Sequence, residues 1–139
     1  MSFRILVVDD EEYIVHLLRR GLVNAGFEVL EAYDGEQALT VAREHKPDLI
    51  LLDVNMPKKN GYQVCRELKA DPNTHDAIVF FVTARGEEID EKEAYEVGAI
   101  KYVTKPFSLR RLVEEIRKAL AQHGKESNGE ARAGGRISR

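Results

Sequence analysis

Five residues that could share one reaction site each follow an apolar segment of this sequence. The segments, which are residues 4–8, 49–52, 78–82 and 99–103, are rich in Val, Ile, Leu and Phe, as is typical of buried parallel strands. In an open α/β sheet, ligands bind beyond the carboxyl ends of the strands. We therefore expect one pocket to gather the polar residues that follow these segments, namely Asp9, Asp10, Asp53, Thr83 and Lys105.

These residue types together are suited to phosphoryl chemistry around a divalent cation. Three carboxylates brought close together raise one another's pKa, so the cluster favours a bound cation, and oxygen ligands favour Mg²⁺. One carboxylate oxygen could then attack phosphorus, as aspartate nucleophiles do in aspartyl-phosphate enzymes. Lys105 would neutralise charge on the transferred group, and Thr83 would donate a hydrogen bond to it. Lys105 also precedes Pro106, and a cis bond between them would turn the lysine over the pocket.

The composition predicts a single intracellular domain. A chain of 139 residues with 43% hydrophobic content can build one core. The net charge of -3 argues against binding to nucleic acid or anionic membranes. The single cysteine, Cys65, excludes an internal disulfide, suits a reducing compartment and is expected to be a buried thiol. No apolar run approaches the roughly 18 residues of a membrane span. We therefore expect a soluble, cytoplasmic protein, with the four scattered histidines on its surface.

The alternation of elements predicts the fold class. Strands alternate with helices five times through connections too long for hairpins, which indicates an α/β fold with a doubly wound, five-stranded parallel sheet and five helices. The mixed segment 27–32 suits an edge strand. Five helices are expected. The first contains Ile14, Leu17, Leu18 and Leu22, the second follows Asp34 as its cap, and the third contains Val64, Cys65 and Leu68. The fourth lies at about 87–97 with Ile89, Ala94 and Val97, and the fifth is capped by Ser108.

The last residues differ in composition from the rest of the chain. From Gly124 onward, Gly, Ser, Asn and Arg dominate and apolar periodicity stops. We expect residues 124–139 to be a disordered tail or the start of a linker, and residues 1–123 to form the domain.

The ordered set of short motifs resembles the receiver domain of two-component response regulators, of the chemotaxis-regulator type. Each motif alone is weak, but the set in this order is specific, and the resemblance covers residues 3–122. The motifs are Val7-Val8-Asp9-Asp10, Asp53-Val54-Asn55-Met56-Pro57 followed by Gly61, Val82-Thr83-Ala84 and Tyr102-Val103-Thr104-Lys105-Pro106-Phe107.

The resemblance implies a fold, a metal and a donor. The fold would be flavodoxin-like with strand order 2-1-3-4-5. The phosphohistidine of a sensor histidine kinase or phosphotransfer protein would phosphorylate Asp53. Mg²⁺ would be bound directly by Asp10 and Asp53, through water by Asp9, and by the backbone carbonyl of Asn55.

The resemblance also implies a switch. Lys105 and Thr83 would hold the phosphoryl group, Thr83 would move toward it, and Tyr102 would rotate into the space so opened. Residues Asn55 and Arg85 would tune the lifetime of the phosphoryl group. A downstream protein would read the surface formed by residues 87–120. Tyr102 could alternatively be a static, half-buried ring.

The sequence departs from the family pattern at two places. Lys59 and Asn60 replace the apolar residue and aspartate that are frequent there, which alters a loop and leaves the chemistry intact. Ile100 and Lys101 replace the two acids found before the switch tyrosine in many regulators with a DNA-binding output domain, which argues against their dimer. We expect a monomer or a weak, phosphorylation-dependent dimer.

Several alternatives to a stand-alone switch remain open. The chain could be a receiver fragment of a longer regulator with an output domain. It could also be a phosphatase that uses an aspartyl phosphate, although such enzymes of the haloacid-dehalogenase type carry Asp-x-Asp rather than Asp9-Asp10-Glu11. A third possibility is an adaptor that works without phosphate. We expect no turnover of an independent substrate, only phosphorylation and dephosphorylation of the protein itself.

Overall fold

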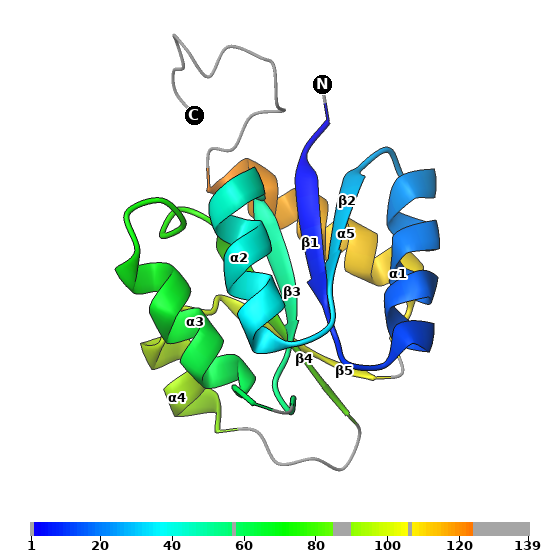
Figure 1. The fold of residues 1–139 in the computed structure, drawn as a ribbon. Coiled ribbons are helices and arrows are strands. Elements are labelled where there is room, and N and C mark those ends of the chain that lie inside the picture. The colour runs from blue at the N-terminus through cyan, green and yellow to red at the C-terminus, as the bar shows by residue number, and fades with distance from the viewer. Residues whose placement is uncertain (1, 57, 85–89, 106, 124–139) are drawn as a thin grey trace, which may run out of the picture.

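The five strands form one parallel sheet in the order β2-β1-β3-β4-β5 (Figure 1). The computed structural model describes residues 2–56, 58–84, 90–105 and 107–123. The predicted strand order and the predicted edge position of β2 are both confirmed. The strands are β1 (Arg4–Val8), β2 (Glu28–Ala32), β3 (Leu49–Asp53), β4 (Ile78–Ala84) and β5 (Lys101–Lys105).

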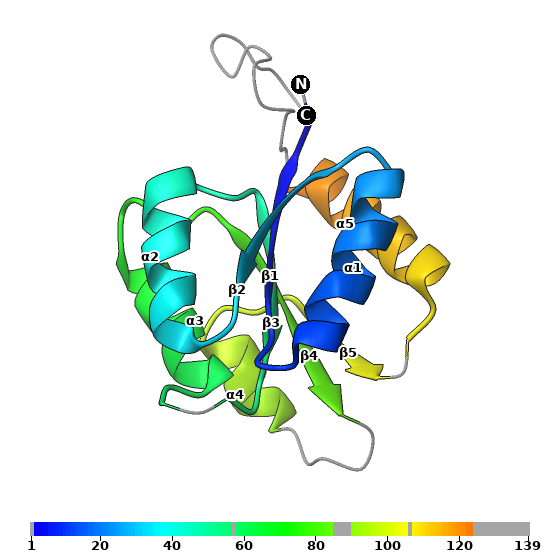
Figure 2. The ribbon, with the colours of Figure 1, turned by 45° about the vertical axis from the view of Figure 1, so that its right-hand side comes forward.

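Helices cover both faces of the sheet, as Figure 1 and Figure 2 show. Alternate strand residues point to opposite faces, so the core is split into two apolar clusters. One cluster packs under α1 and α5, and the other under α2, α3 and α4. This is the doubly wound arrangement that the sequence predicted. The helices are α1 (Glu12–Asn24), α2 (Gly35–His45), α3 (Gly61–Ala70), α4 (Glu91–Glu96) and α5 (Leu109–Gln122).

Local side-chain contacts define where several helices begin and end. The Asp34 carboxylate accepts the backbone N–H of Gln37 at 2.8 Å, and the Ser108 hydroxyl accepts that of Arg111 at 3.3 Å. Both predicted caps of α2 and α5 are thereby confirmed. Gly26 follows α1 with a φ of +100°, a left-handed conformation that glycine adopts without strain.

Three boundaries or faces differ from the prediction. The fourth helix begins at Glu91, because Asp90 is extended and acts as its cap; residues 87–89, including Ile89, lie outside the described residues. Strand β5 is shifted toward its carboxyl end, because the amide of Ala99 still bonds to the end of α4. Helix α1 buries Val15 rather than Leu17, which is 36% exposed.

The sheet register brings the predicted polar residues to one edge of the sheet. Val8 lies beside Leu52 in β3, so Asp9 and Asp53 follow at the same level. Asp53 in turn pairs with Val82 of β4, and Ala84 pairs with Lys105 of β5. One common rim is therefore formed by the carboxyl ends of four neighbouring strands, β1, β3, β4 and β5.

Candidate functional site

Three aspartates converge at the carboxyl ends of β1 and β3. One carboxylate oxygen from each of Asp9, Asp10 and Asp53 lies within 4.8 Å of the others. Asp9 and Asp53 are 2% and 4% exposed, whereas Asp10 is exposed. The backbone fixes both buried acids, because Asp9 accepts the N–H of Glu11 at 3.0 Å and Asp53 accepts that of Asn55 at 3.3 Å. The predicted acidic cluster is therefore present, with one member open to solvent.

Burial and the charges of neighbouring aspartates raise the pKa values of the two buried acids. Burial, together with the neighbouring charge of Asp9, raises the pKa of Asp53 from 3.8 to about 7. Burial also raises the pKa of Asp9, although the Glu11 amide and Lys105 oppose that rise. A cation bound to these carboxylates would favour their charged forms. Such a cluster binds metal more strongly as its protons leave.

Lys105 lies at the end of β5 and reaches the acidic cluster. Its Nζ is 2.9 Å from an Asp9 oxygen and 3.6 Å from a Glu11 oxygen. Burial alone would lower the pKa of Lys105, but the hydrogen bond and charge of Asp9, with further attraction from Asp53 and Glu11, raise it. The amine is therefore a fixed positive charge beside the cluster. The part played by Glu11 was missed, because nothing in the sequence pairs it with a lysine so distant along the chain.

The remaining predicted site residues lie at or near the same rim where the structure describes them. Thr83 is 3% exposed near the end of β4, one position beyond Val82, which is level with Asp53. Asn55 is exposed two positions after Asp53. Tyr102 is half-buried in β5, and its hydroxyl contacts the carboxylate of Glu91 in α4. Two predicted residues, Arg85 and Pro106, lie outside the described residues, and so does the bond proposed to be cis.

A close backbone approach connects the end of β3 to the start of α3. The amide of Gly61 donates to the carbonyl of Val54 at 2.8 Å. A Cβ atom at position 61 would lie 2.6 Å from the carbonyl oxygen of Asp53. Only glycine fits there without displacing backbone. The start of α3 is therefore seated directly against the end of β3.

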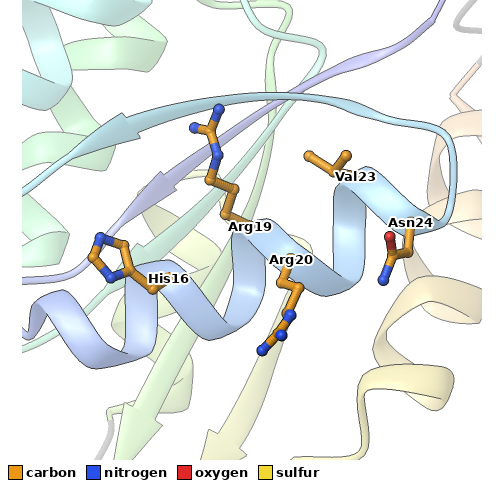
Figure 3. A pocket seen from close by; sticks show the side chains of 5 residues that line it. All are labelled: His16, Arg19, Arg20, Val23 and Asn24. Carbon is orange, nitrogen blue, oxygen red and sulfur yellow. The ribbon is translucent and has the colours of Figure 1, made fainter.

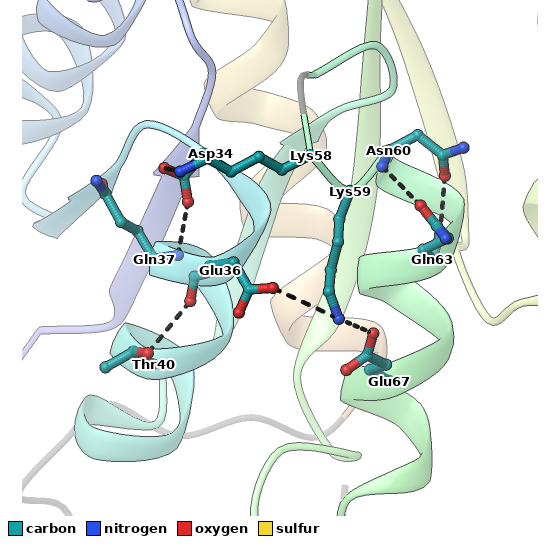
Figure 4. Close-up of polar contacts among 9 residues, drawn as sticks. All are labelled: Asp34, Glu36, Gln37, Thr40, Lys58, Lys59, Asn60, Gln63 and Glu67. Carbon is teal, nitrogen blue, oxygen red and sulfur yellow. Dashed lines mark hydrogen bonds and ion pairs between the residues drawn. The ribbon is translucent and has the colours of Figure 1, made fainter.

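Lys59, which is one of the two departures from the family pattern, and its neighbour Lys58 connect this loop to the adjacent helices (Figure 4). Lys58 lies 3.6 Å from Asp34 at the start of α2. Lys59 lies between Glu36 of α2, at 3.9 Å, and Glu67 of α3. The next residue, Asn60, caps α3 in a reciprocal pair with Gln63, at 3.0 Å in both directions, as the dashed lines in Figure 4 show. The departure leaves the acids in place and gives the loop its own polar supports.

A hollow on α1 lies apart from the acidic site (Figure 3). All five side chains that line it come from that one helix, and Arg19 is already paired with Glu31 of β2 at 2.8 Å. His16 is exposed, as the sequence predicted for its histidines. The hollow adds no group to the acidic cluster. Its lining is His16, Arg19, Arg20, Val23 and Asn24.

The donor set fits Mg²⁺. This ion takes oxygen ligands, usually one or two protein carboxylates, and keeps several waters. The exposed Asp10 beside two buried acids supplies such oxygens and leaves an open side for water or phosphate. Asp9, Asp10 and Asp53 would hold the ion, which would neutralise phosphoryl charge when bound.

The fold and the site together define a class of protein: α/β domains with acids, a threonine and a lysine at the carboxyl rim of a 2-1-3-4-5 sheet. A comparison with protein families makes the class specific. Residues 5–117 match the response regulator receiver domain family, and the chain belongs to that family. It is a receiver domain of the two-component type, which is a signalling switch rather than a metabolic enzyme.

Individual relatives agree with this assignment. The chain is 44% identical over 120 residues to the alkaline phosphatase synthesis transcriptional regulatory protein PhoP of Bacillus subtilis. This match covers 86% of the chain and 49% of PhoP, so the chain spans about half the length of this curated relative. The chemotaxis response regulator CheY4 of Vibrio cholerae superposes with a TM-score of 0.80 at 28% identity, covering 86% of this chain and all of that one. NtrX of Brucella abortus gives 0.79 at 29% identity, covering 88% of this chain and 27% of NtrX.

Within the described part of the chain, no helix combines the length and the apolar character that crossing a membrane requires.

Proposed function

We propose that this receiver accepts a phosphoryl group on Asp53 from a phosphohistidine donor, with Mg²⁺ bound by Asp9, Asp10, Asp53 and the backbone carbonyl of Asn55. The observation that carries the proposal is the convergence of three carboxylates within 4.8 Å, with the Lys105 amine 2.9 Å from one of them. A pocket of this charge pattern suits a phosphoryl group that bridges a cation and an amine.

The proposed chemical step gives each residue of the site a separate role. An oxygen of Asp53 attacks phosphorus, the new O–P bond forms as the N–P bond to the donor histidine breaks, and the bonding electrons stay on the imidazole nitrogen. The Lys105 amine, already at the rim, stabilises the negative oxygens of the transferred group. The Thr83 hydroxyl donates to one of those oxygens, and Asn55 and Arg85 control access of the water that later hydrolyses the bond. The protein thereby catalyses only its own phosphorylation and dephosphorylation.

The phosphorylated form signals through the surface formed by residues 87–120. Movement of Thr83 toward the phosphoryl group opens space for Tyr102, whose ring then turns inward. A hollow of about 440 Å³ between β5 and α5 supports this surface as a place for protein contact. The proposed partners are a sensor histidine kinase or phosphotransfer protein on the donor side and a protein target on the output side. The receiver acts by protein contact, without binding nucleic acid or membrane, as a cytoplasmic monomer or weak dimer.

The proposed domain comprises residues 1–123, with α5 as its last helix, and residues 124–139 as a tail or linker. The transcriptional regulator from Bacillus subtilis is about twice as long as the matched region. That difference supports a second candidate, in which this receiver serves a longer regulator that carries an output domain.

The test is direct phosphorylation. The protein is incubated with Mg²⁺ and a small phosphodonor, acetyl phosphate, and the adduct is located by mass spectrometry. We expect one hydroxylamine-labile phosphoryl group at Asp53, which does not form when Mg²⁺ is omitted and is absent from Asp53→Asn. An adduct on another residue, or none, would refute the proposal, and steady release of phosphate from many monoesters would favour the phosphatase alternative.

A further inference from the structure

Two tyrosine hydroxyls hold consecutive residues at the start of α4. The Tyr62 hydroxyl, from the first turn of α3, accepts the backbone N–H of Asp90 at 3.0 Å. The Tyr102 hydroxyl, from β5, donates to the carboxylate of Glu91. Helix α4 spans only Glu91–Glu96, and so short a helix depends on external contacts for its position. The two tyrosines are therefore among the supports that place its N-terminus.

The same two rings belong to one packed unit beneath Thr83. The Tyr62 ring meets Phe81 edge-on, with ring centroids 5.3 Å apart and an interplanar angle of 74°. Phe81 is the register partner of Tyr102, and both tyrosines pack against the apolar cluster that contains Phe81. Because alternate strand residues share a face, Phe81 lies on the same side of the sheet as Thr83. A change in the position of Tyr102 would therefore alter its packing against Phe81 and, through Phe81, that of Tyr62.

Tyr62 is also coupled to the loop that follows Asp53. The preceding residue, Gly61, donates to the carbonyl of Val54 at 2.8 Å and leaves no room for a side chain against Asp53. A shift of the β3 end therefore moves the first turn of α3 and, with it, Tyr62. This route to α4 is separate from the route through Thr83 and Tyr102.

Further contacts align α3 with α4 along its length. Arg66 lies 3.4 Å from Glu93, and the Cys65 thiol donates to the carbonyl of Val97 at 3.3 Å. Among these contacts, the Tyr62 hydroxyl acts at the helix end that Tyr102 also holds. Loss of that one bond should loosen the N-terminus of α4 while its other end stays attached.

We propose that Tyr62 is a positioning residue, which holds the N-terminus of α4 in the unphosphorylated arrangement and sets how readily α4 leaves it when Asp53 carries a phosphoryl group. The inference rests on the proposed function. Inward rotation of Tyr102 removes its hydroxyl from Glu91 and leaves the Tyr62 bond to oppose movement of α4. A bond present in one arrangement and weakened in the other shifts the balance between them, so its removal favours the released arrangement.

The first experiment uses Tyr62→Phe, which keeps the ring on Phe81 and removes only the hydroxyl. Amide hydrogen exchange is measured by mass spectrometry on the unphosphorylated protein. We expect exchange at residues 90–93 to accelerate roughly two- to tenfold, the factor that corresponds to one net hydrogen bond, while β3 stays unchanged. Tyr13→Phe, which alters a tyrosine that is 73% exposed on α1, is the matched control. Unchanged exchange in α4 of Tyr62→Phe overturns the inference.

The second experiment measures coupling to the phosphoryl site. Beryllofluoride with Mg²⁺ is used as the phosphoryl mimic, and its half-saturating concentration is determined for both variants and the parent protein. We expect this concentration to fall in Tyr62→Phe by about the factor seen in exchange, because binding and release of α4 are linked reciprocally. Faster exchange without tighter binding would overturn the regulatory role and leave Tyr62 as a structural support. Failure of Asp53 to accept phosphate would instead refute the proposed function, while the exchange result would still decide whether Tyr62 holds α4.

Discussion

Replacing Asp53 by asparagine should stabilise the metal-free protein, and the gain should increase with pH. The pKa of Asp53 is about 7 in the folded protein, chiefly because the carboxyl is buried, against an ordinary value of 3.8. Between these values the folded state binds a proton that the unfolded state does not. The free energy of unfolding therefore falls as pH rises from about 4 to about 7. Asp53→Asn keeps the shape of the side chain and removes this dependence.

The expected magnitude follows from the same two pKa values. They differ by roughly three, and each unit is worth about 1.4 kcal/mol, so the full effect above pH 7 is about 4 kcal/mol. At pH 5 less than half of this effect, roughly 1–2 kcal/mol, has developed. The stability difference between Asp53→Asn and the parent protein should thus grow by about 2–3 kcal/mol between pH 5 and pH 8.

Urea unfolding in the presence of EDTA, followed by far-UV circular dichroism, measures this difference at several pH values. Asp76→Asn is the matched control, because it removes a carboxylate whose side chain is 83% exposed and lies outside the acidic cluster. Addition of Mg²⁺ at pH 8 should restore stability to the parent protein, by about 2.7 kcal/mol at a hundred times the dissociation constant, and less to Asp53→Asn. A difference that stays constant between pH 5 and pH 8 would refute the electrostatic reasoning.

Three further predictions concern a close backbone contact, a helix cap and a buried thiol. Gly61→Ala should lower the free energy of unfolding by about 1–3 kcal/mol and weaken Mg²⁺ binding, because its Cβ would meet the Asp53 carbonyl. Urea titration measures the stability and calorimetry the Mg²⁺ affinity. Values equal to those of the parent protein would contradict the close approach. Asp34→Ala should cost about 1 kcal/mol of stability through loss of the α2 cap, whereas Asp34→Asn should recover most of it; equal losses would show that the cap does not matter. Cys65 is fully buried, and burial raises its pKa to about 11. A thiol reagent at pH 8 should therefore label it only as fast as the protein unfolds. Rapid labelling in the absence of urea would contradict this expectation.

Local and periodic features of the sequence predicted most of the fold. The alternation of apolar segments and amphipathic helices is a local pattern, and so are the caps at Asp34 and Ser108, which bond to amides three residues away. The convergence of the acids was predictable because parallel strands share one carboxyl edge. The start of β5 was less predictable, because the amide of Ala99 bonds to α4 and the strand begins only at Lys101.

Contacts between distant elements were beyond the reach of the sequence pattern. The bond from Asp90 to Tyr62 joins α4 to α3, and Lys59 joins α2 to α3, and neither residue type indicates its partner. Tyr62 reads in the sequence as an ordinary apolar residue of a helix. Its hydroxyl acquires a role only because the packing of α3 on Phe81 points it at the start of α4.

The charge balance of the site links the lysine to the metal. Lys105 lies 2.9 Å from Asp9, and its charge also acts on Asp53. A divalent cation held by the same carboxylates would compete with the amine for their negative charge, since both positive groups repel each other at such short range. Binding of the ion should therefore weaken the pairing of Lys105 with Asp9. The amine would then be available to the phosphoryl oxygens, which carry the negative charge that restores the balance. The acids alone therefore bind the ion and the lysine less strongly than the acids and the phosphoryl group do together.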